Sequence, residues 1–370
     1  MTIETAANVE AFEERRNIHG MRIRDVLAVV GAAVSAVAST AFLTSQVFPI
    51  QGPLAFVVVS YLVFVLIYAF LVSFDEDSEA IKDRIATVAV TTAALVIFGT
   101  LVFIVGFTIF RGAEALPYLN FYTQDMQMAG PLDPLSVGGI LHSITGSLIQ
   151  ISIALVITIP LGIVTAVFLN EMPGRYSRFV RTMVEAMTAL PSIVAGLFIY
   201  ATAILLLGLE KSGFAAALAI SVMMLPIMIR ASDVVLRLVP HTLKEASLGL
   251  GAGVWKTVWL VTLPTARSGL TTAIILATAR GIGETSPVLL TSGFTAALNT
   301  NAFKDPMVSL PLQIFQFVKS PEPTMIARGF GTAAVLMTLV LLLFVVARLI
   351  GSDNNRFKAI WSAIKKGNKK

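Results

Sequence analysis

Long apolar stretches recur along the chain and carry few charged residues. None of them alternates apolar and polar positions as a membrane β-strand does. Because each residue of a helix rises about 1.5 Å, roughly 20 apolar residues cross the hydrocarbon of a bilayer. The pattern therefore predicts an all-α integral membrane protein with about eight transmembrane helices, since a helix satisfies its own backbone in lipid. The predicted helices are 26–48, 54–74, 85–110, 144–169, 188–208, 214–230, 268–292 and 330–350.

Composition supports the membrane assignment. Hydrophobic residues make up 56% of the 370 residues and charged residues only 13%, well outside the mixture typical of soluble domains. The absence of cysteine excludes a disulfide framework and thiolate metal sites. Acidic residues among the first 25 positions do not fit a signal peptide, so we expect the first apolar stretch to remain as a helix.

The basic residues indicate the orientation in the membrane. With a cytoplasmic N-terminus, alternating spans place 21 of the 27 basic residues inside and five outside, and leave Arg280 within a membrane stretch. This asymmetry follows the positive-inside rule, so both termini are predicted to be cytoplasmic. The net charge of +5 then reflects orientation. Because the basic residues form no patch interleaved with aromatic residues, we expect no nucleic-acid partner.

Composition also divides the chain into segments. A cytoplasmic segment at 1–25 precedes a transmembrane hairpin at 26–74, and an acidic cytoplasmic link at 75–84 separates this hairpin from the working core at 85–350. A basic cytoplasmic tail follows at 351–370. The hairpin is therefore interpreted as an added module.

Two connections within the core have distinct character. The outer connection 111–143 is rich in proline and glycine, and we expect an irregular loop there. In the inner connection 170–191, arginines at a spacing of three share one helix face, as in a helix that lies at the headgroup boundary. Ordinary positive-inside charge explains the same residues equally well. These arginines are Arg175, Arg178 and Arg181.

The inner loop 231–267 is much longer than the other inner connections and has its own helix punctuation. Pro240 precedes one short helical stretch, and glycines at 249–253 separate it from a second stretch that ends near Pro264. Two short helices around a tight turn outside the membrane suggest a docking element. Small side chains beside Lys244 and Glu245 would let a partner's backbone approach closely.

The spacing in this loop resembles the cytoplasmic signature of ABC importer permeases: E-A-A, three residues, G, nine residues, I, one residue, L-P. Serine replaces the second alanine and valine replaces the isoleucine, and every interval is kept. The resemblance implies coupling helices that insert into a cleft of a separate ATPase. No nucleotide site is expected in this chain, because Trp255 in "GAGVWKT" stands where a P-loop needs glycine. The matching residues are Glu245, Ala246, Ser247, Gly251, Val261, Leu263 and Pro264, with Lys244 directly before them.

The segment "ATARGIGETSPVLLTSG" (277–293) places Arg280 four residues before Glu284, on one helix face. An arginine at membrane depth costs at least ~2.5–3.5 kcal/mol, so it usually has a partner or a function. The partner is either Glu284 or a transported anion, since guanidinium can donate two parallel hydrogen bonds to phosphate. Thr285 and Ser286 add hydroxyl donors before Pro287 disturbs the helix. A purely structural salt bridge remains the alternative, and the two interpretations are compatible.

Together with "LPSIVAGLFIY" (190–200), "LPIMIRASDVVLRLVPHTLKEAS" (225–247) and "SLPLQIFQFVKSP" (309–321), this segment closely resembles the PstA-type permeases of phosphate-specific (Pst) ABC importers. The resemblance covers about 85–350. It implies a type I importer permease core of six helices, to which the hairpin is added, in the cytoplasmic (inner) membrane. It further implies a PstC-like second permease, a dimeric PstB-like ATPase and an external PstS-like phosphate-binding protein. In that family the residues that match Arg280 and Glu284 have a role in the phosphate path.

The sequence thus predicts a permease subunit that passes inorganic phosphate across the bilayer while a partner hydrolyses ATP. No catalytic residues, metal site or cofactor are expected, because the chain has no nucleophile–base pair or metal-ligand cluster in its pattern. One alternative is a permease of the same class for sulfate, molybdate, an amino acid or an opine. The other is a secondary transporter driven by an ion gradient, which would leave the 231–267 loop unexplained.

Overall fold

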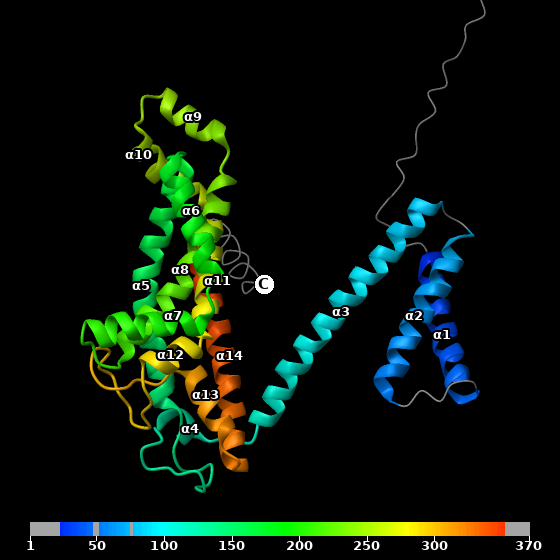
Figure 1. The fold of residues 1–370 in the computed structure, drawn as a ribbon, viewed down its shortest axis with the longest axis horizontal. Helices are drawn as coiled ribbons and strands as arrows, with labels where there is room; N and C mark the ends of the chain where they lie inside the picture. Colours follow the sequence, from blue (N-terminus) through cyan, green and yellow to red (C-terminus); the bar gives the residue numbers. More distant parts are fainter. Residues whose placement is uncertain (1–22, 47–51, 75–76, 352–370) are drawn as a thin grey trace, which may run out of the picture. The chain divides into compact units, whose positions relative to one another are not determined.

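The computed structural model describes residues 23–46, 52–74 and 77–351, and every regular element in these ranges is a helix (Figure 1). The described residues belong to two compact units that divide between Val102 and Phe103. Most of the predicted N-terminal segment and the predicted basic tail lie outside the described residues.

The first unit contains a helical hairpin. Its helices are α1 (Ile23–Gln46) and α2 (Pro53–Val72), and α3 (Ser78–Gly112) begins in this unit and ends in the second. The small side chain of Ala32 is fully buried beside Tyr68, which lets the two helices of the hairpin approach closely. Proline at the first turn of α2 costs no hydrogen bond, because the first amides of a helix have no intrahelical partner.

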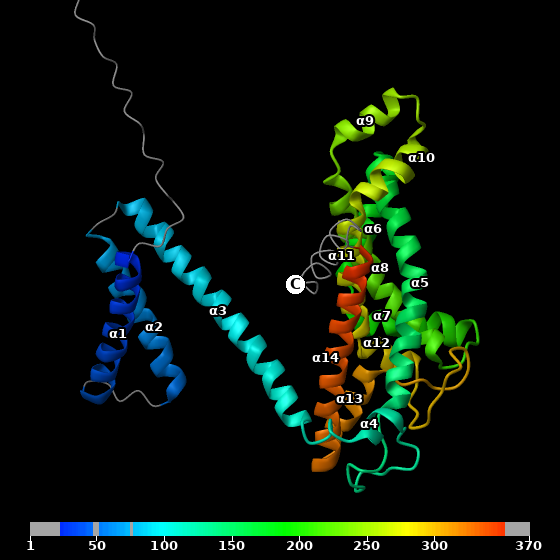
Figure 2. The same ribbon diagram turned by 180° about the vertical axis from the view of Figure 1, so that it is seen from behind.

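The second unit is a bundle in which long helices run beside short ones (Figures 1 and 2). It has two π-helical segments, η1 and η2, each continuous with an α-helix. Its elements are α4 (Leu119–Thr123), α5 (Leu141–Glu171), α6 (Arg175–Thr188), α7 (Ser192–Ile199), η1 (Tyr200–Leu206), α8 (Gly213–Arg237), α9 (His241–Gly249), α10 (Val254–Thr257), η2 (Val258–Thr262), α11 (Leu263–Ile282), α12 (Ser286–Thr291), α13 (Leu310–Lys319) and α14 (Pro323–Gly351).

The core of the bundle is the contact of α8 with α5 and α11. Helix α8 is the most buried of the apolar spans, because its first half is built from alanine and other small residues. A side chain on Gly162 of α5 would collide with Met228 of α8, so glycine is needed at this crossing. Small residues at such contacts let helices approach closely in lipid, where packing replaces the hydrophobic effect as the driving force.

At the opposite end of the bundle from α9, a buried arginine holds the irregular connection between α4 and α5. The Arg328 side chain of α14 is fully buried. Its Nη2 donates to the carbonyl oxygens of Pro134 at 2.8 Å and Val137 at 2.9 Å. It is an internal hydrogen-bond donor that orders the loop.

The described residues contain seven helices long and apolar enough to cross a membrane, and eight if a bent pair counts as one span. The all-α membrane fold is therefore confirmed. The predicted helix 188–208 differs, because Pro191 separates α6 from α7 and the pair bends by 106°. Helix α7 and η1 have only 8 and 7 residues, short of the roughly 20 that a span needs. The predicted helix 268–292 also differs, since α11 ends at Ile282.

Close packing of α7 against α12 generates a prediction. A Cβ on Gly196 would lie 2.6 Å from Pro287 Cα and 3.1 Å from its carbonyl oxygen. Because the backbone cannot yield as a flexible side chain does, Gly196→Ala should destabilise the protein by about 1–3 kcal/mol. Thermal unfolding of the purified protein in detergent measures this effect as a lower midpoint.

Gly106→Ala is the matched control, since a Cβ at Gly106 of α3 meets no atom within 4 Å. The control should leave the midpoint unchanged or raise it slightly, because alanine favours a helix over glycine. Equal midpoints for the two variants would contradict the close α7–α12 contact.

Candidate translocation site and coupling loop

Arg280 and Glu284 form an ion pair where α11 ends. The Arg280 Nη2 and Glu284 Oε1 atoms are 3.0 Å apart, as the four-residue spacing predicted. Although the two atoms lie within ion-pair range, the Oε1 oxygen receives no well-aligned hydrogen bond from the described residues. The Glu284 side chain is only 7% exposed, whereas that of Arg280 is 55% exposed. The carboxylate is thus fixed inside the bundle and the guanidinium reaches its surface.

The pair sits at a break between two helices. Helix α11 ends at Ile282, Gly283 follows it, and α12 begins at Ser286 with Pro287 in its first turn. Proline suits this position, because its missing N–H would have no partner in the first turn. The helix therefore breaks before Pro287, at Gly283, and Pro287 starts the next helix. Thr285 is the residue directly before α12, and its hydroxyl makes no capping hydrogen bond to that helix.

A small polar cavity adjoins Glu284. Its volume is about 10 Å³, which is the room of roughly one water molecule. It is lined by residues from four parts of the bundle. In this conformation the cavity cannot admit phosphate, so passage of such an anion requires the helices to separate here. The lining residues are Ser147, Gln150, Ile151, Ile220, Gly281, Ile282, Glu284 and Ser309.

Two of these polar residues have unused hydrogen-bonding capacity. Gln150 donates through Nε2 to the Met307 carbonyl oxygen at 2.8 Å, but its Oε1 has no partner among the described residues. The Ser309 hydroxyl likewise has none. Buried polar atoms without partners are costly, so they mark a place for water or a polar ligand.

These residues were not predicted from the sequence. The available signal was the spacing of Ser143, Ser147 and Gln150, which puts three polar side chains on one face of an otherwise apolar helix. Ser309 comes from a loop far along the sequence, and no local pattern connects it with α5.

The cavity borders α5, a helix long and apolar enough to span a membrane. Gln150 is nine residues from the start of α5 at Leu141, so it lies about 14 Å along that helix. Figure 1 shows α12 part-way along the length of α5. Charges at this depth are rarely left facing lipid, because the hydrocarbon does not solvate them.

The loop that resembles the importer signature folds as two short helices. Helix α9 holds Lys244, Glu245, Ala246 and Ser247, and it projects at one end of the bundle with α10 (Figure 2). The turn between them passes through Gly251, whose φ of +85° is a conformation that side chains disfavour. The Ser247 Oγ and Thr257 Oγ1 atoms are 2.9 Å apart, which ties the two helices together.

The loop is shorter than the predicted 231–267. Helix α8 continues to Arg237, and α10, η2 and α11 form one apolar run from Val254 to Ile282. Leu263 and Pro264 therefore begin α11 and do not end a separate second helix. A proline fits here because the π-helical turn directly before it already departs from regular α-helical bonding.

An ion pair fastens α9 to the bundle. Lys244 Nζ donates to Glu171 Oε1 at 2.5 Å and to Asn170 Oδ1 at 2.9 Å, at the end of α5. The Lys244 and Glu171 side chains are only 12% and 17% exposed. Glu245, the first residue of the signature, makes no ion pair within the described residues and is exposed.

The family of transport proteins described as "Binding-protein-dependent transport system inner membrane component" matches residues 158–353, which include the ion pair and the coupling loop. The chain belongs to this family. It is a transport subunit that spans the membrane several times, and its resemblance to PstA-type permeases is confirmed by the relatives that follow.

Curated relatives carry the name of phosphate permeases. The chain is 38% identical to "Phosphate transport system permease protein PstA 1" of Mycobacterium tuberculosis over 271 residues, which is 73% of this chain and 88% of the relative. It is 37% identical to PstA of Mycobacterium leprae over 70% of this chain and 85% of that protein. A chain of the inward-facing MetNI methionine ABC transporter is 19% identical with a TM-score of 0.41, and the alignment covers 58% of this chain and 91% of that chain.

The Lys244–Glu171 contact generates a prediction for this permease. Because both side chains are largely buried, Lys244→Met and Glu171→Gln should be strongly non-additive in a double-mutant cycle. The expected interaction energy is about 0.5–3 kcal/mol, measured from the unfolding of single and double variants in detergent.

The chain supplies its own control in Lys82 and Glu79, which are 2.7 Å apart with 72% and 83% exposed side chains. Solvent screens such a pair, so its cycle should give no more than about 0.5 kcal/mol. The contact between α9 and α5 would be refuted by a Lys244–Glu171 energy no larger than that of the exposed pair.

Proposed function

We propose that this chain is a membrane-spanning permease subunit of an ATP-driven importer of inorganic phosphate. The observation that carries the proposal is the Arg280–Glu284 ion pair, with its carboxylate buried in the bundle, in a chain whose curated relatives are phosphate permeases. Arg280, Glu284, Thr285 and Ser286 are the proposed path residues.

The unequal exposure of the pair supports a path role. Half of the Arg280 side chain is open to the surroundings of the single chain, and lipid is an unfavourable surrounding for a guanidinium. A PstC-like second permease that covers this face would enclose a polar path between the two subunits. Guanidinium then offers two parallel donors to phosphate, while Glu284 pairs with it when no anion is present.

The exposed helix α9 supports coupling to a dimeric PstB-like ATPase. Glu245 on this helix and Leu250 directly after it are exposed, and Ala246 and Ser247 leave room for close backbone approach. Closure of the ATPase would push on α9 and α10, and the bundle would open on one side as it closes on the other. An external PstS-like protein would deliver phosphate at the opposite end.

This arrangement assigns the orientation. The coupling loop must be cytoplasmic to meet an ATPase, which agrees with the 21 of 27 basic residues placed inside by the alternating spans. Both termini are then cytoplasmic in the inner membrane. The added hairpin and the segments at either end have no assigned role.

The proposed substrate path generates a prediction. In proteoliposomes that hold the whole importer, Arg280→Gln should abolish ATP-dependent uptake of labelled phosphate, because the path loses its guanidinium donors. Arg280→Lys should retain partial uptake, since the charge remains and the two-pronged donor geometry is lost. Arg111→Gln, at the end of α3, is the control and should leave uptake unchanged.

Other outcomes of this experiment decide between the rivals. Uptake of sulfate or another small anion in place of phosphate would retain the importer class and overturn the substrate. Uptake that continues without the ATPase would overturn the importer itself and favour a secondary transporter.

The proposed coupling role of α9 generates a further prediction. Glu245→Ala should uncouple ATP hydrolysis from uptake or weaken assembly with the ATPase, as measured by co-purification and by ATP hydrolysed per phosphate moved. Glu210→Ala, which removes an exposed carboxylate from the loop after η1, should change neither quantity. Normal coupling in Glu245→Ala would remove α9 as the docking element.

A further inference from the structure

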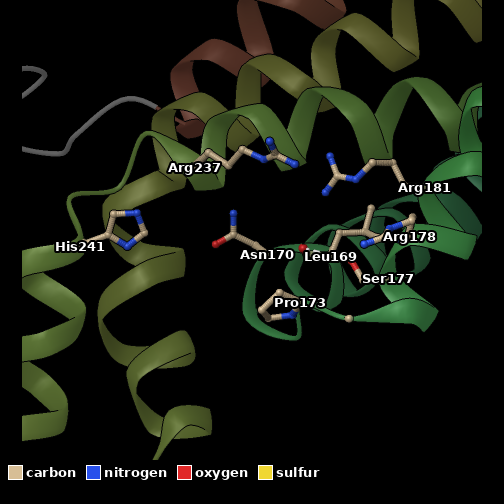
Figure 3. A pocket seen from close by; sticks show the side chains of 9 residues that line it. Leu169, Asn170, Pro173, Ser177, Arg178, Arg181, Arg237 and His241 are labelled. Carbon is tan, nitrogen blue, oxygen red and sulfur yellow. Dashed lines mark hydrogen bonds between the residues drawn. The ribbon is translucent and has the colours of Figure 1, made fainter.

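A pocket of about 530 Å³ opens beside the coupling loop, among α5, α6, α8 and the start of α9. It is separate from the cavity at Glu284 and shares no residue with it. Its lining is mostly polar or basic, as Figure 3 shows. The lining residues are Leu169, Asn170, Pro173, Gly174, Ser177, Arg178, Arg181, Arg237 and His241.

The pocket carries an excess of positive charge. Asp233 lies between Arg181 and Arg237, with its Oδ2 atom 3.1 Å from Arg181 Nη1 and 2.9 Å from Arg237 Nη2. Figure 3 shows the guanidinium groups of these two arginines pointing toward one another. Arg178 makes no ion pair with the described residues. Three guanidinium groups against one carboxylate leave two net positive charges.

Other lining groups also donate hydrogen bonds. Asn170 accepts from Lys244 through Oδ1, so its amide nitrogen remains free to donate. In Figure 3 this nitrogen points toward the space beside Arg181 and Arg237. A pocket lined by several donors, beside a carboxylate that is already paired, favours a ligand that has several anionic oxygens.

We propose that this pocket binds a phosphate-type oxyanion at the cytoplasmic end of the permease and that its occupancy restrains helix α9. The restraint follows from the residues that line the pocket. His241 is the first residue of α9, and Asn170 is bonded to Lys244 of the same helix. An anion held by Arg178 and Asn170 would therefore link α6 and α5 to the coupling helix through Lys244. The proposed binding of the anion does not depend on the proposed function, whereas the effect on ATP hydrolysis rests on it.

The oxyanion has two possible sources with the same chemistry. Free orthophosphate can enter from the cytoplasm, and the phosphodiester of an anionic lipid can enter from the headgroup region, beside which the amphipathic α6 is predicted to lie. The experiment below separates the two.

The test uses the assembled importer in nanodiscs, with Arg178→Gln compared against Arg175→Gln. Both arginines are exposed on α6, but only Arg178 lines the pocket. In discs of neutral phosphatidylcholine, wild type and Arg175→Gln should bind labelled orthophosphate equally. Arg178→Gln should bind about tenfold more weakly, which is the loss expected for about 1.4 kcal/mol. Arg280 is intact in all three proteins, so binding at the translocation site cancels in the comparison.

Discs that contain phosphatidylglycerol identify the lipid source. If the headgroup occupies the pocket, native mass spectrometry should show phosphatidylglycerol retained by wild type and Arg175→Gln and lost from Arg178→Gln. Either ligand supports the oxyanion site. The site is overturned if neither phosphate nor phosphatidylglycerol binding differs between the two variants. It is also overturned if Arg178→Gln only weakens assembly with the ATPase, since the pocket would then be a protein contact.

The restraint on α9 has its own measurement. Added phosphate should slow ATP hydrolysis by the importer, and the phosphate concentration for half inhibition should rise about tenfold in Arg178→Gln. It should stay at the wild-type value in Arg175→Gln, where product inhibition of the ATPase itself is unchanged. Altered binding with unaltered inhibition would retain the site and remove its link to α9.

Discussion

The structure depends on keeping one carboxylate, that of Glu284, inside a bundle whose outer surface is apolar. Burial of an ionised group is costly unless a partner compensates it. Arg280 supplies that partner from the last turn of α11, and Gly281, packed against Met224, lets α8 come close enough to seal the other side. The break at Gly283 lies directly before Glu284, so the chain leaves the helix at the position where the carboxylate is buried.

Much of the fold follows from the sequence because lipid imposes a simple rule. Each span must be long and apolar, so α1, α2, α5 and α14 lie close to their predicted positions. The Arg280–Glu284 pair was also predictable, since two charges four residues apart in an apolar stretch have few other partners. The loop that holds α9 and α10 stood out in the sequence because its signature fixes residue types at fixed intervals.

The remaining features depend on contacts between segments remote in sequence. Nothing local to Gln150 or Ser309 indicates that both border the same cavity. The buried position of Arg328 likewise depends on a loop nearly two hundred residues away. The bend at Pro191 was hidden because the apolar residues after it continue long enough to resemble a full span.

A mechanical connection between α10 and the Arg280–Glu284 pair follows from these details. From Val254 to Ile282 the chain is one run of 29 helical residues, so α10 and Arg280 lie on the same continuous helical run. Glu284 lies beyond the break and belongs to the connection with α12. We infer that a shift of α10 moves Arg280 while Glu284 stays with the bundle, which changes the distance between the two charges. Under the proposed coupling to a distant ATPase, the two charges must be able to move apart. This requires that they lie on either side of a helix break, because two residues of one unbroken helix would move together.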